Sequence, residues 1–374
     1  MSKVLAFLFL AITLISCVPS VYQPYPIDAI SLPRDEAAHR APIEWWYWTG
    51  HLQDEAGHDY GFELTFFKAY APENARLFGF IPAWWLVEKG HIGHFAITDL
   101  GNKDFHMAQI SDFGNFEAST SEENLDLRLH TWSAQKIGER EYQIKAELGD
   151  KKLELFLTAE KPMALHGNPP GIQSMGPGGV SYYLSYTRMA AEGVLKTNCT
   201  LFSCEEHKVT GQAWHDHQWG DFTLDAYAGW DWFSLQLDDN TEVMLYFIRQ
   251  PDGSYSTAAG SFIDQVGQVK NLSSDDFSLT PTGKLWKSET TGAVYPLEWT
   301  LSIPGRGLEL LISPLLEKQE MNTRATTGIV YWEGAVGISG SHTGKGYVEL
   351  TNYDLYPYGE PQSELKPLSG PLGN

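Results

Sequence analysis

The sequence predicts an all-β protein built from two consecutive antiparallel β-barrel domains. Aromatic strands broken by Gly, Asn and Asp turns recur from Glu44 onward, as in YGFELTFFKAY and WFSLQLDD. Period-two alternation is frequent and long helical periods are rare, which is typical of strands. Aromatic residues make up 13% of the 374 residues, and flat rings pack well on a pleated surface. Many short strands with regular turns favour closed or nearly closed antiparallel sheets.

The second observation is that the two halves of the chain resemble each other. EWWYWTGHLQDEAGHDYGFELTFFK and GWDWFSLQLDDNTEVMLYFIR, about 185 residues apart, share the order aromatic strand, acidic turn, aromatic strand. SYYLSYTRMAAEG followed by GQAWHDHQW likewise resembles IVYWEGAVGISG followed by GKGYVELTNY. An internal duplication explains both matches, whereas chance similarity between aromatic strands is the alternative. We therefore predict domains at residues 42–224 and 225–374, with the boundary between Phe222 and Gly229.

The N-terminus has the pattern of an export signal. A basic start, MSK, precedes the apolar run VLAFLFLAITLI, which is too short to favour a permanent membrane span. LISC resembles a bacterial lipobox, so we expect a lipoprotein signal peptide at residues 1–16 and lipidation of Cys17. A plain secretory peptide is the alternative. The Pro-rich residues 17–41 lack periodicity and are expected to form a tether. Val18 rather than Asp after Cys17 favours the periplasmic face of the outer membrane in a Gram-negative cell.

The charge balance limits the partners. With 47 acidic and 26 basic residues the formal net charge is −21, which argues against nucleic acid and against adsorption on anionic lipid. We expect a monomer whose partner is a small apolar ligand and whose membrane contact is the N-terminal lipid alone. Beyond Cys17, Cys199 and Cys204 either form a short-loop disulfide in an oxidising compartment or remain two unpaired thiols.

A Gly- and Pro-rich stretch, HGNPPGIQSMGPGG, spans His166 to Gly179. It contains no Lys and so lacks the Gly-Lys-Ser/Thr sequence of a phosphate loop, which excludes nucleotide binding through this segment. Long loops in compact domains are often functional, so we interpret it as a flap over a barrel mouth rather than as a simple connector.

The densest cluster of polar and aromatic residues is WHDHQW. In a strand alternate residues share a face, so His215, His217 and Trp219 point one way and Trp214 and Asp216 the other. Alignment with the second half places Trp214 on Tyr347 and Asp216 on Glu349. A pattern common to both halves is most simply structural. The histidines, by contrast, stand where the second half has Val348 and Leu350, and polar groups inside a barrel need a partner or a task. This contrast favours function at His217.

The same residues fit two other chemistries less well. His-x-His supplies two metal ligands on one strand, but no HExxH motif accompanies it and no third ligand is fixed by spacing, so no metal is predicted. A Ser-His-Asp hydrolase is disfavoured because G-x-S-x-G is absent. Asp231 lies between Trp230 and Trp232, where desolvation would favour a protonated carboxyl fit for general acid catalysis. A strand cap is the alternative for Asp231, and Glu44 in EWWYW is either a similar acid or a buried acceptor.

These motifs together, with GHFAITD and YWEGAVGISG, resemble the AttH/CrtC-like family of predicted secreted hydrolases, which is related to carotenoid 1,2-hydratase. The resemblance runs from about Glu44 to about Tyr353 and implies two lipocalin-like barrels. It also implies water addition to an alkene without metal or organic cofactor. The hydratase His and Trp match His217 and Trp219, and its Asp matches Asp231. Its Tyr two residues earlier is replaced by Gly229, which counts against carotenoid hydration itself.

The sequence therefore predicts a secreted, lipid-anchored enzyme that hydrates or isomerises an alkene of an isoprenoid or lipid-like substrate. Asp231 would be the acid, His217 the base, and indole faces would stabilise the cation. Its site residues are expected to be His217, Asp231 and Trp219 for catalysis and His215, Trp230, Trp232, Glu44, Trp46 and Tyr183 for substrate binding. The alternatives are a non-catalytic carrier of an apolar ligand and an esterase or lactonase.

Overall fold

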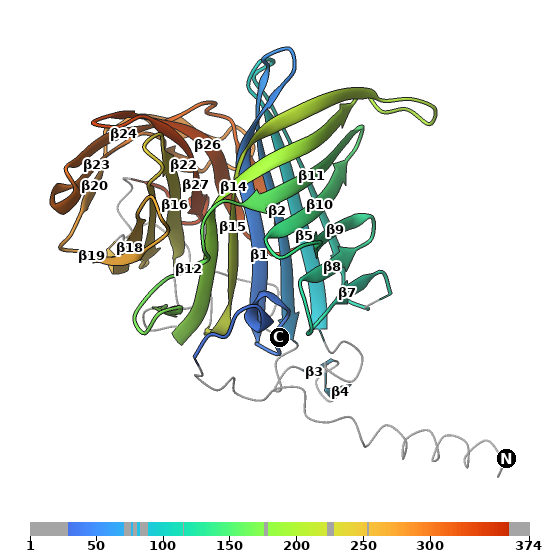
Figure 1. Ribbon diagram of the computed structural model, residues 1–374, viewed down its shortest axis with the longest axis horizontal. Coiled ribbons are helices and arrows are strands. Elements are labelled where there is room, and N and C mark those ends of the chain that lie inside the picture. Colours follow the sequence, from blue (N-terminus) through green and yellow to red (C-terminus); the bar gives the residue numbers. More distant parts are fainter. Residues whose placement is uncertain are drawn as a thin grey trace, which may run out of the picture.

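The computed structural model describes residues 29–70, 76–77, 81–82, 89–114, 116–175, 179–222, 228–252 and 254–358. Within these ranges nearly all regular structure is β, and the helical elements are the short 3-10 turns η2 (Arg34–Glu36) and η6 (Pro304–Arg306). None of the helices in the described part of the chain has the length and apolar character needed to cross a bilayer. Two large curled antiparallel sheets lie side by side (Figure 1). The predicted all-β class with two consecutive barrel-like sheets is confirmed.

The first sheet has 13 strands, with the order β6-β5-β2-β1-β15-β14-β11-β10-β9-β8-β7 and with β12 and β13 added to β14. Its strands are β1 (Ile43–Asp54), β2 (Asp59–Tyr70), β5 (Lys89–Asp99), β6 (Asp104–Asp112), β7 (Ala118–Thr120), β8 (Asp126–Leu129), β9 (Trp132–Lys136), β10 (Glu141–Leu148), β11 (Lys151–Ala159), β12 (Ala164–Leu165), β13 (Ile172–Ser174), β14 (Gly179–Thr197) and β15 (Glu205–Phe222).

The second sheet has 10 strands in the order β19-β18-β17-β16-β27-β26-β24-β23-β20, with β25 added to β26. Its strands are β16 (Gly229–Leu237), β17 (Glu242–Arg249), β18 (Tyr255–Ile263), β19 (Val269–Ser273), β20 (Ser278–Pro281), β23 (Trp299–Ile303), β24 (Leu308–Pro314), β25 (Glu320–Asn322), β26 (Val330–Gly340) and β27 (Gly344–Thr351). Two small hairpins, β3 (Arg76–Leu77) with β4 (Ile81–Pro82) and β21 (Leu285–Lys287) with β22 (Val294–Pro296), complete the described structure.

The two sheets share one strand plan. In each, the first strand pairs with both the second and the last: β1 lies between β2 and β15, and β16 between β17 and β27. The neighbours beyond them also correspond, β14 with β26 and β11 with β24. A duplicated sequence with the same alternation of buried positions folds to the same strand order, which is the arrangement that the internal repeat predicts.

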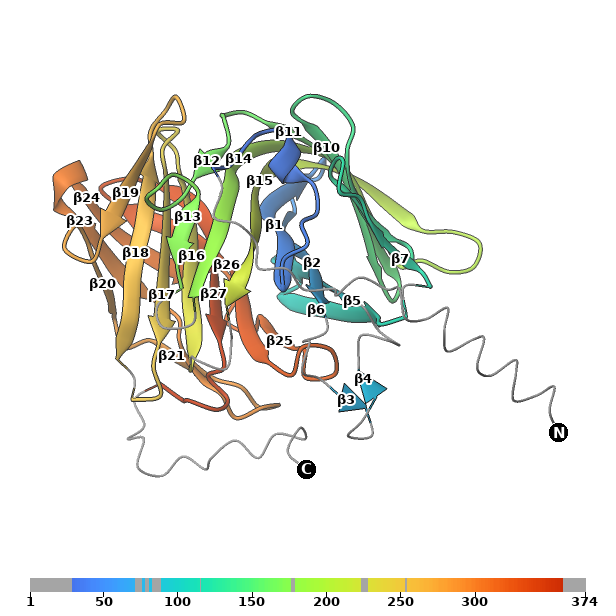
Figure 2. The same ribbon diagram turned by 90° about the horizontal axis from the view of Figure 1, so that it is seen from below.

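Each sheet closes around its own hydrophobic core, and a third core joins them. The inward side chains of the first sheet, including Trp48 and Phe62, form one cluster, and those of the second, including Phe233 and Trp299, form another. The third lies between β1, β14 and β15 on one side and β16, β17 and β27 on the other. Figure 2 shows the two sets of strands side by side. The outward faces of the central strands are therefore also buried, which explains why these strands are aromatic on both sides.

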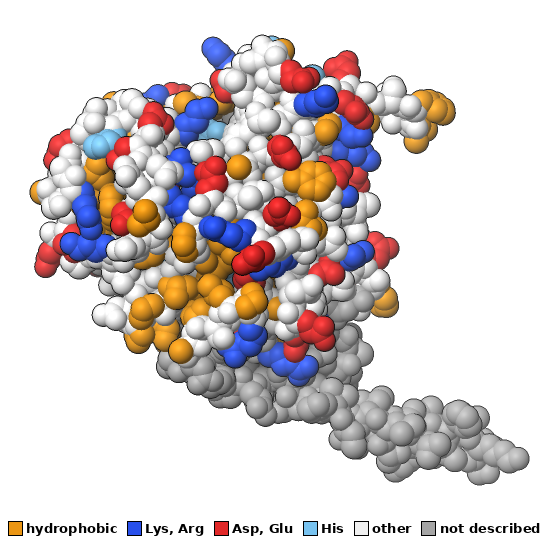
Figure 3. All heavy atoms as spheres, in the orientation of Figure 1, with side chains coloured by type: hydrophobic (Ala, Val, Ile, Leu, Met, Phe, Trp, Pro, Cys, Tyr) orange, Lys and Arg blue, Asp and Glu red, His pale blue; other side chains and the backbone are white. Residues whose placement is uncertain are grey.

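Ion pairs and hydrogen bonds cross between the two sheets. Glu242 on β17, which is fully buried, accepts from Lys161 Nζ at 2.9 Å and from Arg188 Nε on β14 at 2.6 Å. Thr98 Oγ1 on β5 donates to Gln319 Oε1 at 2.8 Å. These contacts fix the two sheets against each other and so fix whatever lies between them. On the outer face seen in Figure 3, basic and acidic side chains are interspersed, without a continuous basic patch.

The N-terminal segment differs from its prediction at one end. Cys17, the expected signal peptide and the first part of the expected tether lie outside the described residues. Residues 35–41, assigned to the tether from their lack of periodicity, pack on the first sheet instead. Asp35 and Glu36 are buried, and Lys136 Nζ donates to Glu36 Oε1 at 2.6 Å. Specific ion pairs hold this segment in place, and such pairs leave no periodic signal in a sequence.

Cys199 and Cys204 are joined by a disulfide at the tip of the β14–β15 hairpin. Of the two states that the sequence allows, the structure has the bonded one.

Candidate active site between the two sheets

A cavity of about 310 Å³ lies between the two sheets. Its wall is mostly aromatic and aliphatic, and both sheets contribute to it; the larger rings are Trp45, Tyr47, Phe67, Trp230, Trp232 and Tyr246. Gln173 and Met175, from the loop that the sequence singles out, also line the cavity. Part of the expected flap therefore forms cavity wall. An apolar cavity with a few convergent polar groups is the usual form of a small-molecule site.

Asp216 on β15 is one of two carboxyl groups in the cavity wall. Tyr183 Oη donates to its Oδ2 at 2.6 Å, and Ser185 Oγ and Trp214 Nε1 donate to its Oδ1. Burial raises the pKa of Asp216 to about 7, although the three donors favour the ionised form and work in the opposite direction. Asp216 therefore exchanges a proton near neutral pH, which is unusual for an aspartate and useful for acid–base chemistry.

Glu349 on β27 is the second carboxyl group in the wall. Trp230 Nε1 donates to its Oε2 at 3.1 Å. Removal from bulk water raises the pKa of Glu349 to about 7, and the negative charges of Asp216 and Asp231 raise it further. The side chain is half-buried because the cavity itself leaves part of its surface accessible. Because Asp216 and Glu349 repel each other when both are ionised, one tends to keep its proton while the other is charged.

A third buried acid touches the wall through a tyrosine. Tyr47 Oη, whose ring lines the cavity, donates to Glu333 Oε1 on β26 at 2.6 Å. Burial, and then the charges of Glu349 and Glu63, raise the pKa of Glu333 well above its usual range. Burial between the sheets thus favours the protonated form of Glu333.

The residues that the sequence favoured for catalysis lie on the other face of β15. His217 is inside the first barrel, 1% exposed, and its Nε2 is 2.9 Å from Glu44 Oε1. Its ring stacks on Trp46 with centroids 4.8 Å apart and lies next to Trp219 at 4.6 Å. Burial lowers the pKa of His217 to about 4, so its imidazole is neutral at pH 7. His217 and Trp219 are not among the residues that line the cavity.

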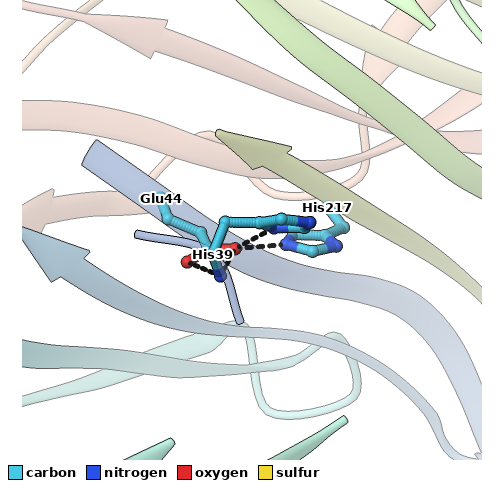
Figure 4. Close-up of side chains that lie close together, drawn as sticks. All are labelled: His39, Glu44 and His217. Atoms are coloured by element: carbon cyan, nitrogen blue, oxygen red, sulfur yellow. Dashed lines mark hydrogen bonds and ion pairs between the residues drawn. The ribbon is translucent and has the colours of Figure 1, made fainter. Parts of the chain in front are cut away.

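His217 belongs to a compact polar group with Glu44 and His39 (Figure 4). Glu44 is fully buried and accepts from His39 Nδ1 at 2.8 Å, while Lys68 Nζ lies 2.5 Å from its second oxygen. Burial opposes ionisation of Glu44, but the positive charge of Lys68 and the histidine hydrogen bonds outweigh it, and its pKa falls well below the usual range. Glu44 is therefore fully paired inside the barrel, whereas Nδ1 of His217 has no hydrogen-bond partner among the described residues.

The same group has the donor types of a metal site, since ligand atoms of His39, Glu44 and His217 lie within 4.8 Å of one another. Lys68, however, already supplies a positive charge at 2.5 Å from Glu44, and the backbone amide of His39 also donates to both carboxylate oxygens. The donors are therefore matched without an ion, and a cation would have to displace an ammonium group. His215, the other half of His-x-His, is elsewhere, stacked on Trp48 with Nδ1 3.0 Å from Tyr47 O.

Asp231 also points away from the cavity. Arg249 Nε lies 3.1 Å from its Oδ1 and Tyr353 Oη donates to its Oδ2 at 3.1 Å. Burial raises its pKa, while the Arg249 charge and these hydrogen bonds act against that rise. A carboxylate held by a guanidinium is a poor proton donor. Its neighbours Trp230 and Trp232 do line the cavity, as does Tyr183, so three of the expected substrate-binding residues meet there and Glu44, Trp46 and His215 do not.

The sequence pattern assigns Asp216 and Glu349 to architecture, because both halves have a carboxyl at that position. The structure brings the two together, since the cavity forms between corresponding faces of the duplicated sheets. Only the knowledge that these faces meet would have revealed the pair. The available signal was the repeated aromatic-x-acid pattern itself, in Trp214–Asp216 and Tyr347–Glu349.

A family model described as AttH-like matches residues 23–353. The chain belongs to the AttH-like family. Within this family's fold, a crystal structure of an AttH protein from Nitrosomonas europaea superposes with a TM-score of 0.77 at 33% identity, covering 89% of this chain and 100% of that one. The family fold thus extends over both sheets.

Two further similarities are to proteins named kievitone hydratase. Kievitone hydratase of Fusarium solani subsp. phaseoli is 22% identical over 258 residues, which are 66% of this chain and 69% of that protein. The crystal structure of kievitone hydratase from Nectria haematococca has a TM-score of 0.67 at 16% identity, covering 88% of this chain and 96% of that one, which shows a shared fold.

Proposed function

We propose that the protein is an enzyme that hydrates or isomerises an alkene of an apolar, isoprenoid- or lipid-like substrate by acid catalysis in the cavity between the sheets. The observation that carries this proposal is the pair of cavity carboxyls, Asp216 and Glu349, each with a pKa raised to about 7 inside an aromatic wall. The sequence similarity to kievitone hydratase supports the same reaction class.

Glu349 is the better acid of the two. Among the described side chains, one donates to Glu349, that of Trp230, whereas three donate to Asp216, and donors stabilise the ionised form. In the proposed reaction Glu349 transfers its proton to one alkene carbon, and positive charge develops on the other. The faces of Trp230 and Trp232 attract that cation. Asp216 then accepts a proton from water as the water oxygen bonds to the cationic carbon.

The same arrangement accounts for isomerisation. If Asp216 removes a proton from the carbon next to the cation instead of from water, the double bond re-forms one position away. Both outcomes use the proton of Glu349 and the ionised carboxylate of Asp216, and both need only groups of this chain. Which one occurs depends on whether water reaches the cation beside Asp216.

A non-catalytic carrier of an apolar ligand is the second candidate, favoured by the predominantly apolar wall. Carboxyl groups in such a wall cost free energy by desolvation, of about 1–3 kcal/mol each. A carrier gains nothing from them, whereas an acid–base enzyme requires them. The carboxyl pair therefore favours the enzyme.

The test uses a panel of isoprenoid alkenes and lipid-like esters in H₂¹⁸O and, separately, in D₂O. Incorporation of ¹⁸O into an alkene product indicates hydration, and deuterium at carbon without ¹⁸O indicates isomerisation. Asp216→Asn and Glu349→Gln are each expected to lower kcat about 10²-fold or more while retaining ligand binding. Asp231→Asn is the comparison variant: it should be inactive if Asp231 is the acid, as the family resemblance implies, and active if Glu349 is. If stoichiometric binding persists without turnover of any substrate, the protein is a carrier.

We also propose, as the sequence predicts, that the chain is exported and lipid-anchored through Cys17 on the periplasmic face of the outer membrane. The Cys199–Cys204 disulfide supports an oxidising compartment. Membrane fractionation of cells that express the wild type or Cys17→Ala tests the anchor: the variant is expected in the soluble fraction. Equal membrane association of both would remove the lipid anchor from the proposal.

A further inference from the structure

A chain of hydrogen-bonding side chains leads from Asp216 to the surface of the second sheet. Ser185 Oγ, which donates to Asp216, is 2.8 Å from His166 Nε2, and His166 Nδ1 is 2.9 Å from Ser261 Oγ. Ser261 Oγ in turn lies 3.3 Å from Oδ1 of Asn271, an exposed residue. The chain starts on β14 of the first sheet, crosses through the loop residue His166 and ends on β18 and β19 of the second.

Every internal member of this chain is removed from solvent. Ser185, His166 and Ser261 each have 0% exposure. Burial alone lowers the pKa of His166 to about 3, and no ion pair among the described residues involves it. The imidazole is therefore neutral near pH 7, with a proton on only one of its nitrogens. An apolar side chain would fill the same space without needing two hydroxyl partners. The reaction proposed above does not use His166.

The protonation state of Asp216 decides which nitrogen carries that proton. An ionised Asp216 can only accept hydrogen bonds. Ser185 therefore donates its hydroxyl hydrogen to Asp216 and must itself accept a hydrogen bond from His166 Nε2–H. His166 Nδ1 is then bare and accepts from Ser261. All donors in this state point toward Asp216.

When Asp216 is protonated the order reverses. Its O–H donates to Ser185 Oγ, the hydroxyl of Ser185 donates to His166 Nε2, and Nδ1–H of His166 donates to Ser261. The hydrogen of Ser261 is then free to turn toward Asn271 Oδ1, the acceptor 3.3 Å away. Both states satisfy every member of the chain, and they differ by one proton and by the tautomer of His166.

We propose that His166 is a proton relay that connects Asp216 to the solvent edge of the second sheet through Ser185 and Ser261. To protonate Asp216, Ser261 takes a proton from water that displaces the Asn271 side chain and passes its own to Nδ1. Nε2–H passes to Ser185, whose hydrogen passes to Asp216. Release is the reverse, so each bond broken is matched by one formed and no charge stays on the imidazole.

The role of the relay in catalysis rests on the proposed function. After each hydration Asp216 holds the proton taken from water, and it must lose that proton before the next turnover. Once the water beside Asp216 has been consumed and the product fills the cavity, bulk water does not reach Asp216 from that side. A route through His166 returns Asp216 to its ionised form without emptying the cavity.

The tautomer of His166 tests the relay without any substrate. In ¹⁵N-histidine NMR of the intact protein, with the His166 signals identified by their loss in His166→Gln, we expect Nδ1–H below pH 7 and Nε2–H above it. The change should follow the titration of the Asp216 carboxyl band in the infrared spectrum. In Asp216→Asn we expect one tautomer at every pH. If wild-type His166 keeps one tautomer while Asp216 titrates, the relay is overturned.

Kinetics give the second measurement. Glutamine at position 166 can still donate to Ser185 and accept from Ser261, but it cannot exchange one nitrogen's proton for the other's. On a substrate found in the panel above, His166→Gln is expected to lower kcat about tenfold or more with KM unchanged and to enlarge the solvent isotope effect. Unchanged kcat would overturn the relay. A tautomer change in a protein without turnover would instead overturn the proposed function and leave the relay standing.

Discussion

Asp216 and Glu349 occupy corresponding positions in the two sheets and line one cavity. Asp216 on β15 lies opposite Tyr47 on β1, and Glu349 on β27 lies opposite Trp232 on β16. Duplication thus provides two carboxyls in one apolar space, and different neighbours make them unequal: Asp216 accepts from three side chains and Glu349 from one. An acid and a base can arise in this way from what was one position.

Tyr183 should set the pH at which Asp216 becomes an effective base. Its hydroxyl donates to Asp216 Oδ2 at 2.6 Å and so stabilises the carboxylate. Tyr183→Phe removes this donor, which raises the pKa of Asp216. We expect the acidic limb of the kcat/KM profile to move up by about one pH unit. Tyr246→Phe is the control, because Tyr246 also lines the cavity but its hydroxyl bonds to Gln173 and Ser174. An equal movement in both variants would contradict the assignment.

Glu349 should make the fold less stable as the pH rises. Its pKa is raised in the folded state, so between about pH 4.5 and 7 the native protein binds more protons than the unfolded chain, and stability falls with increasing pH. Above pH 7 the penalty is fully present. Glu349→Gln mimics the protonated form and is expected to be about 1–2 kcal/mol more stable than the wild type at pH 8 and nearly equal at pH 4.

Denaturant unfolding at the two pH values checks this difference. Glu289→Gln, at an exposed glutamate, should change stability little at either pH. A Glu349→Gln variant that is no more stable at pH 8 than at pH 4, relative to the wild type, would show that Glu349 is ionised without cost in the folded protein.

The sequence predicted the architecture better than the site. Alternation of aromatic residues and the internal repeat indicate local pairing and chain order, and both survive folding because each strand buries a face within its own sheet. The cavity depends on which outer faces of the two sheets meet, and no strand pattern encodes that. His217 and Asp216 illustrate the point. A polar residue on an inner barrel face suggests function, but His217 pairs there through Nε2 with Glu44 and stacks on Trp46, while the repeated carboxyl of Asp216 faces the cavity.

His217 should contribute to stability more than to chemistry. His217→Gln can keep a donor to Glu44 but loses the stacking on Trp46, so we expect a loss of about 1–3 kcal/mol in the free energy of unfolding. Turnover per folded molecule should stay within a few-fold of the wild type, because His217 does not line the cavity. A His217→Gln protein with unchanged melting temperature and no turnover would restore the catalytic role that the family resemblance implies.

Glu242 should hold the two sheets in register and thereby preserve the cavity. It is fully buried and carries ion pairs with both Lys161 and Arg188, so Glu242→Gln leaves two buried cations with one neutral partner. We expect a loss of about 3 kcal/mol or more, since an uncompensated buried charge costs far more than an exposed one. Lys284→Gln breaks the exposed pair with Glu317 and should cost less than about 1 kcal/mol. Thermal unfolding of both variants checks the contrast.

Because the carboxyls of Asp216 and Glu349 come from different sheets, binding of a cavity ligand should weaken in Glu242→Gln and stay unchanged in Lys284→Gln. Equal binding in both variants would show that the remaining inter-sheet contacts suffice.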